Sequence, residues 1–205
     1  MANEKIHEYV DQVGIYEIQN YDIMVDTEVF DGSNWLSKKL LLKDSILPYY
    51  KSFGELFMTG FNWFPSGANL PRPILFNSSY VMNQIGIGYD AYGQPSIISV
   101  VRGGYFQIDA TLQIARSSGG AVQELSLWLR QSGSDVQNSN MHVSVVANTT
   151  LMVVTYSKIV YIGDYQNIQL MWSVTDANIY LKNEVANTSV PHPATSPARL
   201  IIKPL

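Results

Sequence analysis

Residues 105–114 alternate strictly between apolar and polar side chains. The apolar positions are Phe106, Ile108, Ala110, Leu112 and Ile114. A period of two is typical of a β-strand that buries one face. The alternation resumes in residues 124–130 after a turn at 116–120, with leucines at every second position. The two segments together predict a β-hairpin.

Short apolar segments continue along the rest of the chain, separated by turn residues. Further strands are predicted at 55–59, 74–76, 85–88, 96–101, 141–146, 151–161, 167–172, 179–181 and 199–203. In the turn at 131–136, Gly133 favours a positive φ and Asp135 is expected to bond its own backbone. Because the apolar run at 199–203 is continuous, we expect that strand to lie centrally in a sheet. Many short strands at this spacing predict an antiparallel β-sandwich.

Residues 1–53 follow a different pattern from the rest of the chain. We expect a short strand at 21–25, a turn through Asp31-Gly32, and a helix that begins after an N-cap at Asp44. The chain is therefore predicted to consist of a small α+β module at 1–53 and a larger β domain at 54–205.

Residues 127–140 read LWLRQSGSDVQNSN, and they are followed by Gly163-Asp164 and by IQLMWS at 168–173. This combination resembles a domain common in tailed-phage virion proteins, especially those of marine and cyanobacterial phages. That domain is similar to the trimeric jelly roll of tumour-necrosis-factor and complement globular heads. Over residues 54–205 the resemblance implies an antiparallel jelly-roll sandwich that forms a homotrimer within a virion.

The N-terminal segment resembles the short module that precedes many phage fibre and appendage proteins. It shares a Met-Ala-Asn-Glu-Lys-Ile start, an acidic strand that ends near Asp26, and the pair Lys38-Lys39. The resemblance implies virion attachment, with Asp26, Lys38 and Lys39 as the candidate residues. The segment departs from the pattern at Pro48 and in an irregular stretch after Asp26. An N-terminal lobe that simply packs on the sandwich is the alternative.

Charge is sparse and unevenly placed. The formal net charge is -4, and residues 1–53 carry nine acidic against five basic side chains, whereas residues 54–205 carry eight of each. A body with no excess of positive charge offers little attraction to phosphates. We therefore expect no nucleic-acid partner.

The chain has no cysteine, so disulfides and thiol chemistry are excluded. The first residues lack an apolar signal core, and no apolar run reaches the length of a membrane span. We expect a protein without a membrane partner, assembled into a virion in the host cytoplasm.

Candidate catalytic residues are few and scattered. His7, His142 and His192 lack metal-ligand spacing. Asp109 and Asp164 are expected to serve surface polarity and turn formation, because no second carboxylate is placed to pair with either. No phosphate loop, nucleophile elbow or calcium loop is present. The sequence therefore predicts a protein that is not an enzyme and has no cofactor or metal.

Large side chains on the non-core faces of strands favour association. Tyr105, Trp128 and Met171 lie out of phase with the core residues, and we expect a homotrimer to cover them. Trp63 and Phe64, beside a Pro-rich loop, offer a possible platform for a glycan, although covering the end of the core is the more ordinary role.

The resulting hypothesis is a homotrimeric phage structural protein, either a capsid decoration or a head fibre, that attaches through its N-terminal module to other virion proteins. The alternative is a neck or tail fibre or adaptor whose jelly-roll head binds a host-surface glycan. A glycan-cleaving enzyme is the least favoured interpretation.

Overall fold

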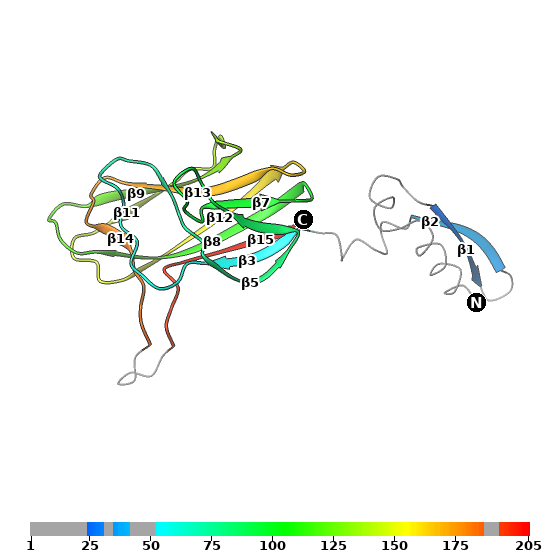
Figure 1. Cartoon of the computed structure of the whole chain (residues 1–205), viewed down its shortest axis with the longest axis horizontal. Coiled ribbons are helices and arrows are strands. Elements are labelled where there is room, and N and C mark those ends of the chain that lie inside the picture. The colour runs from blue at the N-terminus through cyan, green and yellow to red at the C-terminus, as the bar shows by residue number, and fades with distance from the viewer. Residues whose placement is uncertain (1–23, 31–34, 42–51, 187–192) are drawn as a thin grey trace. The chain divides into compact units, whose positions relative to one another are not determined.

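The computed structural model describes residues 24–30, 35–41, 52–186 and 193–205. The chain divides into two compact units, Met1–Tyr50 and Lys51–Leu205. Figure 1 shows the strands of both units.

The described part of the first unit is a pair of antiparallel strands. β1 (Met24–Phe30) pairs with β2 (Trp35–Leu41), and the register sets Asp26 opposite Lys39. The strand thus continues through the stretch after Asp26 that was predicted to be irregular. The predicted turn at 31–34 and the predicted helix after Asp44 lie outside the described residues.

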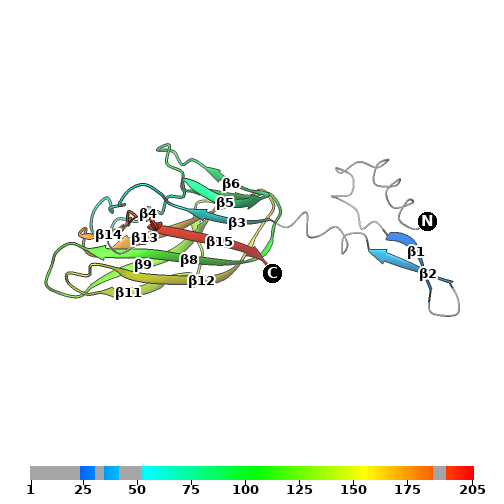
Figure 2. The same cartoon turned by 90° about the horizontal axis from the view of Figure 1, so that it is seen from below.

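The second unit is a sandwich of two antiparallel sheets (Figure 1, Figure 2). Sheet I has the order β12-β8-β15-β3-β5, with β14 also paired to β8. Its strands are β3 (Phe53–Phe57), β5 (Ser78–Asn83), β8 (Gly104–Arg116), β12 (Met152–Ile162), β14 (Ile179–Leu181) and β15 (Ala198–Pro204).

Sheet II has the order β10-β9-β13-β7-β6, with β11 also paired to β9 and β4 to β13. Its strands are β4 (Arg72–Pro73), β6 (Ile85–Gly88), β7 (Ile97–Val100), β9 (Gln123–Gln131), β10 (Ser134–Asp135), β11 (Met141–Val145) and β13 (Asn167–Val174). The two sheets make an antiparallel jelly-roll β-sandwich, which confirms the predicted fold class.

The core lies between the sheets and includes the residues that the alternation identified. Phe106, Ile108 and Leu112 of β8 are buried against Leu125 and Leu127 of β9. β15 lies between β8 and β3, as the apolar run at 199–203 predicted. Each of these strands gives one face to the core, so apolar burial drives sheet packing.

The predicted hairpin between 105–114 and 124–130 is wrong. β8 pairs with β12, β15 and β14, whereas β9 pairs with β13, β11 and β10 in the other sheet. Strict alternation shows which face of a strand is buried. The same alternation is found whether two strands lie side by side in one sheet or face each other across a core. The segment at 117–122 therefore carries the chain from one sheet to the other.

That crossing is folded around the side chain of Arg116, which is almost fully buried. Its Nε and Nη2 atoms contact Asp176 Oδ2 at 2.9 and 2.8 Å, and its Nη1 donates to the carbonyl oxygen of Ala121 at 2.6 Å. A β-carbon on Gly119, whose φ is +113°, would collide with the guanidinium. One buried cation thus ties the loop to the end of β8.

Two turns contain an aspartate whose carboxylate bonds to another segment. In the first turn, Gly133 has the predicted positive φ, 86°. Asp135 links two side chains of β9, because its Oδ1 accepts from Trp128 Nε1 at 2.9 Å and from Arg130 Nε at 2.7 Å. Asp164 lies in the turn between β12 and β13, and its Oδ1 accepts from the backbone N–H of Gly103 at 2.6 Å, which ties that turn to the start of β8.

Candidate association face

The outer face of sheet I, which points away from the core, carries large apolar side chains that one copy of the chain leaves in water. On β12, Val153, Ile159 and Tyr161 are 57%, 58% and 57% exposed. Tyr105 of β8 is 62% exposed and packs edge-on against Tyr161, with ring centroids 5.3 Å apart. β12 is also an edge strand of sheet I. An edge strand that carries exposed apolar groups is a template for pairing with another chain.

A polar cluster lies in the middle of the same face. Asp109 accepts from Ser157 Oγ at 2.6 Å and from Gln107 Nε2 at 2.9 Å, and it pairs with Lys203 Nζ at 2.8 Å. Burial alone would raise the pKa of Asp109, but hydrogen bonds from Lys203, Ser157 and Gln107 outweigh it and lower that pKa. The carboxylate is therefore held ionised at the polar centre of a face whose margin on β12 is apolar.

The opposite margin of sheet I is also apolar. On the edge strand β5, Tyr80 is exposed and its ring lies 4.5 Å from that of Phe57 on β3. Val81, opposite Glu55, is exposed on the same face, whereas Met82 is paired with the buried Gly54 and points to the other side of the strand. Between the margins, Arg199 Nε pairs with Glu55 Oε1 at 2.7 Å. The face thus has apolar margins around a paired, charged centre.

The three residues predicted for the trimer interface do not form one surface. Tyr105 lies on the outer face of sheet I, whereas Trp128 and Met171 are cross-strand partners in sheet II. Met171 is only 2% exposed in a single copy. The reason for expecting sister copies to cover Met171 is therefore wrong, since the fold of one chain already covers it. Trp128 is half-buried and is held by its hydrogen bond to Asp135.

Sequence reasoning missed Val153, Ile159 and Tyr161, although a signal was present. In residues 152–162 both alternating sets contain apolar side chains: Val154, Tyr156 and Val160 are buried, and the intervening positions include the three exposed ones. A strand that is apolar on both faces needs a cover on each side.

The predicted glycan-loop residues meet side chains from two other segments. The Arg72 guanidinium lies 4.1 Å from the ring centroid of Trp63, and the Phe64 ring stacks on Tyr180 at 4.7 Å. The attachment candidates Asp26, Lys38 and Lys39 lie on β1 and β2, and their role stays a prediction.

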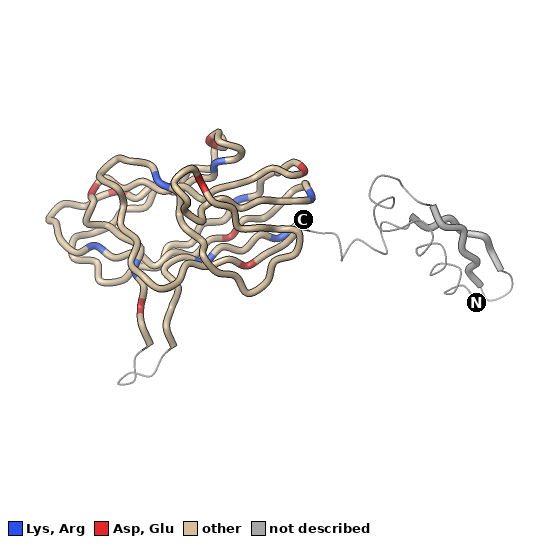
Figure 3. The backbone as a smooth tube through the Cα atoms, viewed as in Figure 1, with Lys and Arg blue, Asp and Glu red and all other residues tan. Residues whose placement is uncertain are grey.

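Chemistry at other positions is limited. His142 is exposed and contacts Ser126 and Asn140 through its ring nitrogens, while His7 and His192 lie outside the described residues. Across the described ranges no three His, Cys, Asp or Glu side chains are grouped to hold a metal ion. The same ranges contain no helix that is long and apolar enough to cross a membrane. Basic and acidic residues are interspersed along the described backbone of the second unit (Figure 3).

The chain matches no family model and no curated protein. Among solved structures, it is similar to the globular domain of zebrafish complement 1qA protein, with a TM-score of 0.46 and 11% identity over 76% of this chain and 98% of that one. It is also similar to murine APRIL, with a TM-score of 0.44 and 10% identity over 74% of this chain and 98% of that one. The strand order itself identifies the described part of the second unit, residues 52–186 and 193–205, as a jelly-roll sandwich.

Proposed function

We propose that the chain is a non-enzymatic structural protein that associates through the outer face of sheet I into a homotrimer. This proposal rests on the apolar surface of β12 and β8. Ile159 and Tyr161 on the edge strand β12, and Tyr105 on the neighbouring β8, are exposed to solvent. Soluble proteins rarely leave such a surface open. Closed rotational symmetry covers the surface and ends the association at a fixed number of copies.

The number three comes from the resemblance of residues 127–140 and 168–173 to trimeric phage and cytokine-like heads. A stable obligate contact buries on the order of 2,000 Å². The outer face of sheet I, which extends from the edge strand β12 to the edge strand β5, is the surface proposed to form this contact.

The same resemblance supports a place in a virion. In this proposal the first unit attaches the protein to a capsid component, with Asp26, Lys38 and Lys39 on its two strands, and the jelly roll projects as a capsid decoration or head fibre. The first unit, Met1–Tyr50, is compact in its own right, which suits an attachment module.

Sedimentation equilibrium of the full chain tests the association. The expected mass is about three times the 23.0 kDa of one chain at micromolar concentration. Tyr161→Asp introduces a charge into the apolar face and is expected to dissociate the trimer. Tyr92→Asp is the matched control, since Tyr92 is exposed on the loop between β6 and β7 of sheet II. A wild-type protein that sediments as one copy contradicts the proposal.

Cryo-electron microscopy of the phage particle tests the virion assignment. Density for a trimeric knob on the head supports decoration or head-fibre function, and density at the neck or tail supports the alternative position. Purified particles that lack the protein contradict any structural role in the virion.

A second candidate function is a neck or tail fibre or adaptor whose jelly roll binds a host-surface glycan. It is favoured by Phe64, which is 49% exposed although its ring is already stacked on Tyr180. A ring that is fixed in place but open to solvent suits recognition of a ligand.

A further inference from the structure

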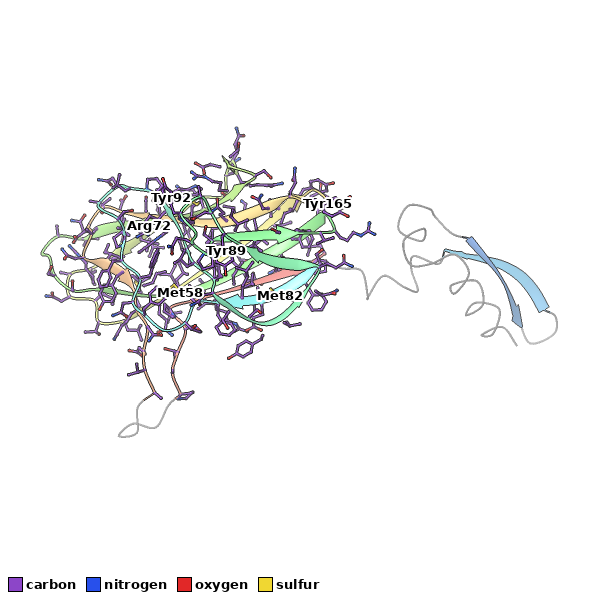
Figure 4. The ribbon with its side chains drawn as sticks, viewed as in Figure 1. Met58, Arg72, Met82, Tyr89, Tyr92 and Tyr165 are labelled. Carbon is purple, nitrogen blue, oxygen red and sulfur yellow. The ribbon has the colours of Figure 1, made fainter. Side chains whose placement is uncertain are left out.

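Five side chains form a continuous cluster that we name the aromatic–arginine cluster. Its members are Phe61, Trp63, Phe64, Arg72 and Tyr180. The Arg72 guanidinium lies over the Trp63 ring, and its Nη1 donates to the Phe64 carbonyl oxygen at 3.0 Å. Phe61 contacts the Trp63 ring edge-on at 5.9 Å, and Phe64 stacks on Tyr180. In Figure 4, Arg72 lies toward the end of the sandwich opposite Tyr165.

The backbone beneath the cluster is fixed by hydrogen bonds to β14 and the segment after it. Trp63 and Leu181 exchange two backbone hydrogen bonds, each 2.9 Å long. Asn62 Oδ1 accepts from the backbone N–H of Asn183 at 2.8 Å. The rings are therefore held in place before any ligand arrives, which reduces the entropy lost on binding.

The charge of Arg72 has no anion in contact among the described residues. None of the ion pairs there includes this guanidinium. Asp90 is near enough to raise the pKa of Arg72, yet burial has the larger effect and lowers it. The Asp90 carboxylate is committed elsewhere, since its Oδ1 accepts from the backbone N–H of Tyr92 and of Gln94 and its Oδ2 from Ser96 Oγ.

A half-buried guanidinium without an ion pair favours binding an anion. Removing a cation from water costs free energy that an opposite charge restores, and the planar guanidinium suits a carboxylate with two parallel hydrogen bonds. Beside it, Phe61 and Phe64 are 41% and 49% exposed. Flat apolar rings next to a carboxylate receptor match a ligand that has an apolar ring face and a carboxylate at its edge.

We propose that the aromatic–arginine cluster binds a carboxylate-bearing pyranose, such as the uronate units of an acidic polysaccharide. Arg72 receives the sugar carboxylate, and the exposed rings of Phe61 and Phe64 cover the C–H face of the pyranose. This inference rests on the second function proposed above, glycan binding, and names the chemical class of its ligand.

Isothermal titration calorimetry of the full chain with uronate tetrasaccharides tests the proposal. Tetramers of galacturonic, mannuronic and glucuronic acid are titrated, and the best of them is compared with its methyl ester. We expect saturable binding of at least one acid. Its methyl ester should bind with an affinity lower by about tenfold or more, and added salt should lower the affinity for the acid. Arg72→Gln is expected to weaken binding by about tenfold or more.

Arg130→Gln is the matched control, because it removes an arginine paired with Asp135 on sheet II and leaves the cluster intact. Phe64→Ala provides a second test, since it removes an exposed ring while Arg72 keeps its place on Trp63. Melting curves of each variant show whether it is folded. Folded Phe64→Ala is expected to weaken binding of the acid and its ester alike.

Several results would overturn the assignment. One is the absence of saturable binding of any uronate at up to about 10 mM. The others are equal affinity for the acid and its ester, and a loss of affinity in Arg130→Gln equal to that in Arg72→Gln. An oligoglutamate peptide that binds as tightly as the uronate would show a receptor for acidic peptides instead. Because neither Arg72 nor Phe64 lies on a strand of sheet I, sedimentation of the same variants separates this outcome from failure of the trimer.

Discussion

Arg116→Met probes the buried ion pair that ties the loop between β8 and β9 to the sandwich. The wild-type guanidinium is 1% exposed and contacts Asp176 through two nitrogens. Its Nη1 also donates to the carbonyl oxygens of Ala121 at 2.6 Å and Val145 at 3.4 Å. Methionine fills much of the same space with a flexible apolar chain, so the substitution removes the charge and the donors without opening a large cavity.

The magnitude follows from what the substitution leaves behind. Two carbonyl oxygens lose a donor, and the Asp176 carboxylate loses its cation. Removing one partner of a buried ion pair typically costs about 3–5 kcal/mol. The Asp176 side chain is 18% exposed, so water compensates part of the loss and about 3 kcal/mol is expected. For a domain of this size that loss lowers the melting temperature by about 6–12 °C.

Differential scanning calorimetry of the full chain measures the effect. Wild type and variant are compared at equal concentration, because association makes the melting temperature depend on protein concentration. Arg130→Met is the control. Its ion pair with Asp135 is solvent-exposed, with side chains 29% and 53% accessible, and such a pair contributes about 0–1 kcal/mol.

A melting temperature of Arg116→Met within about 2 °C of wild type would show that the loop does not depend on the buried cation. An equal decrease in Arg130→Met would show that loss of any arginine has the same effect, and the role assigned to burial would then be wrong.

Three further substitutions test the loop glycine, the Asp176 carboxylate and the buried Tyr156 hydroxyl. Gly119→Ala should destabilise the fold by about 1–3 kcal/mol, because the residue has a φ of +113° and its β-carbon would meet the guanidinium. Gly120→Ala, with open space around its β-carbon, should be nearly neutral in the same denaturation assay. The pKa of Asp176 is lowered by backbone and arginine hydrogen bonds, which outweigh burial. Its stabilisation is therefore present above about pH 4 and lost as the pH falls through its folded pKa; Asp176→Asn should flatten that acid decline in urea titrations. Burial raises the pKa of Tyr156 to about 12, so wild type should lose stability as the pH rises from about 10 to 12, and Tyr156→Phe should lose less over the same range.

Much of the sandwich followed from the residues alone, because alternation reports directly on burial. β8, β9 and β15 lie where the apolar positions predicted, and the central place of β15 follows from its continuous apolar run. Pairing did not follow, since β8 and β9 have the same pattern whether they share a sheet or face each other. The loop that joins them is folded around the buried Arg116, and nothing in the sequence shows that this charge turns inward to meet Asp176, 60 residues later in the chain.

Surface residues were predicted less well than core residues, for a related reason. Phase within a strand shows that Met171 points away from the core, but it does not show what else of the same chain covers that face. Met171 is buried in a single copy, whereas Tyr105, chosen by the same rule, is 62% exposed. Whether a side chain on the outer face of either sheet is exposed depends on which other segments cover that face, and only the folded chain shows this.

The polar centre of the outer face of sheet I bears on how copies would align. An apolar surface alone tolerates many relative positions of two copies, because burial of apolar area has little directional preference. Asp109 is held ionised by Lys203, Ser157 and Gln107, and a sister copy that covers this carboxylate with apolar groups strips away its water. Arrangements that keep the carboxylate solvated or offer it a donor are then favoured over those that do not, as a single buried polar residue selects register in coiled coils.

Asp109→Leu is therefore expected to keep association but to yield a mixture of oligomers in sedimentation velocity. A single sharp trimer peak for that variant would mean that shape, and not the charged centre, selects the arrangement.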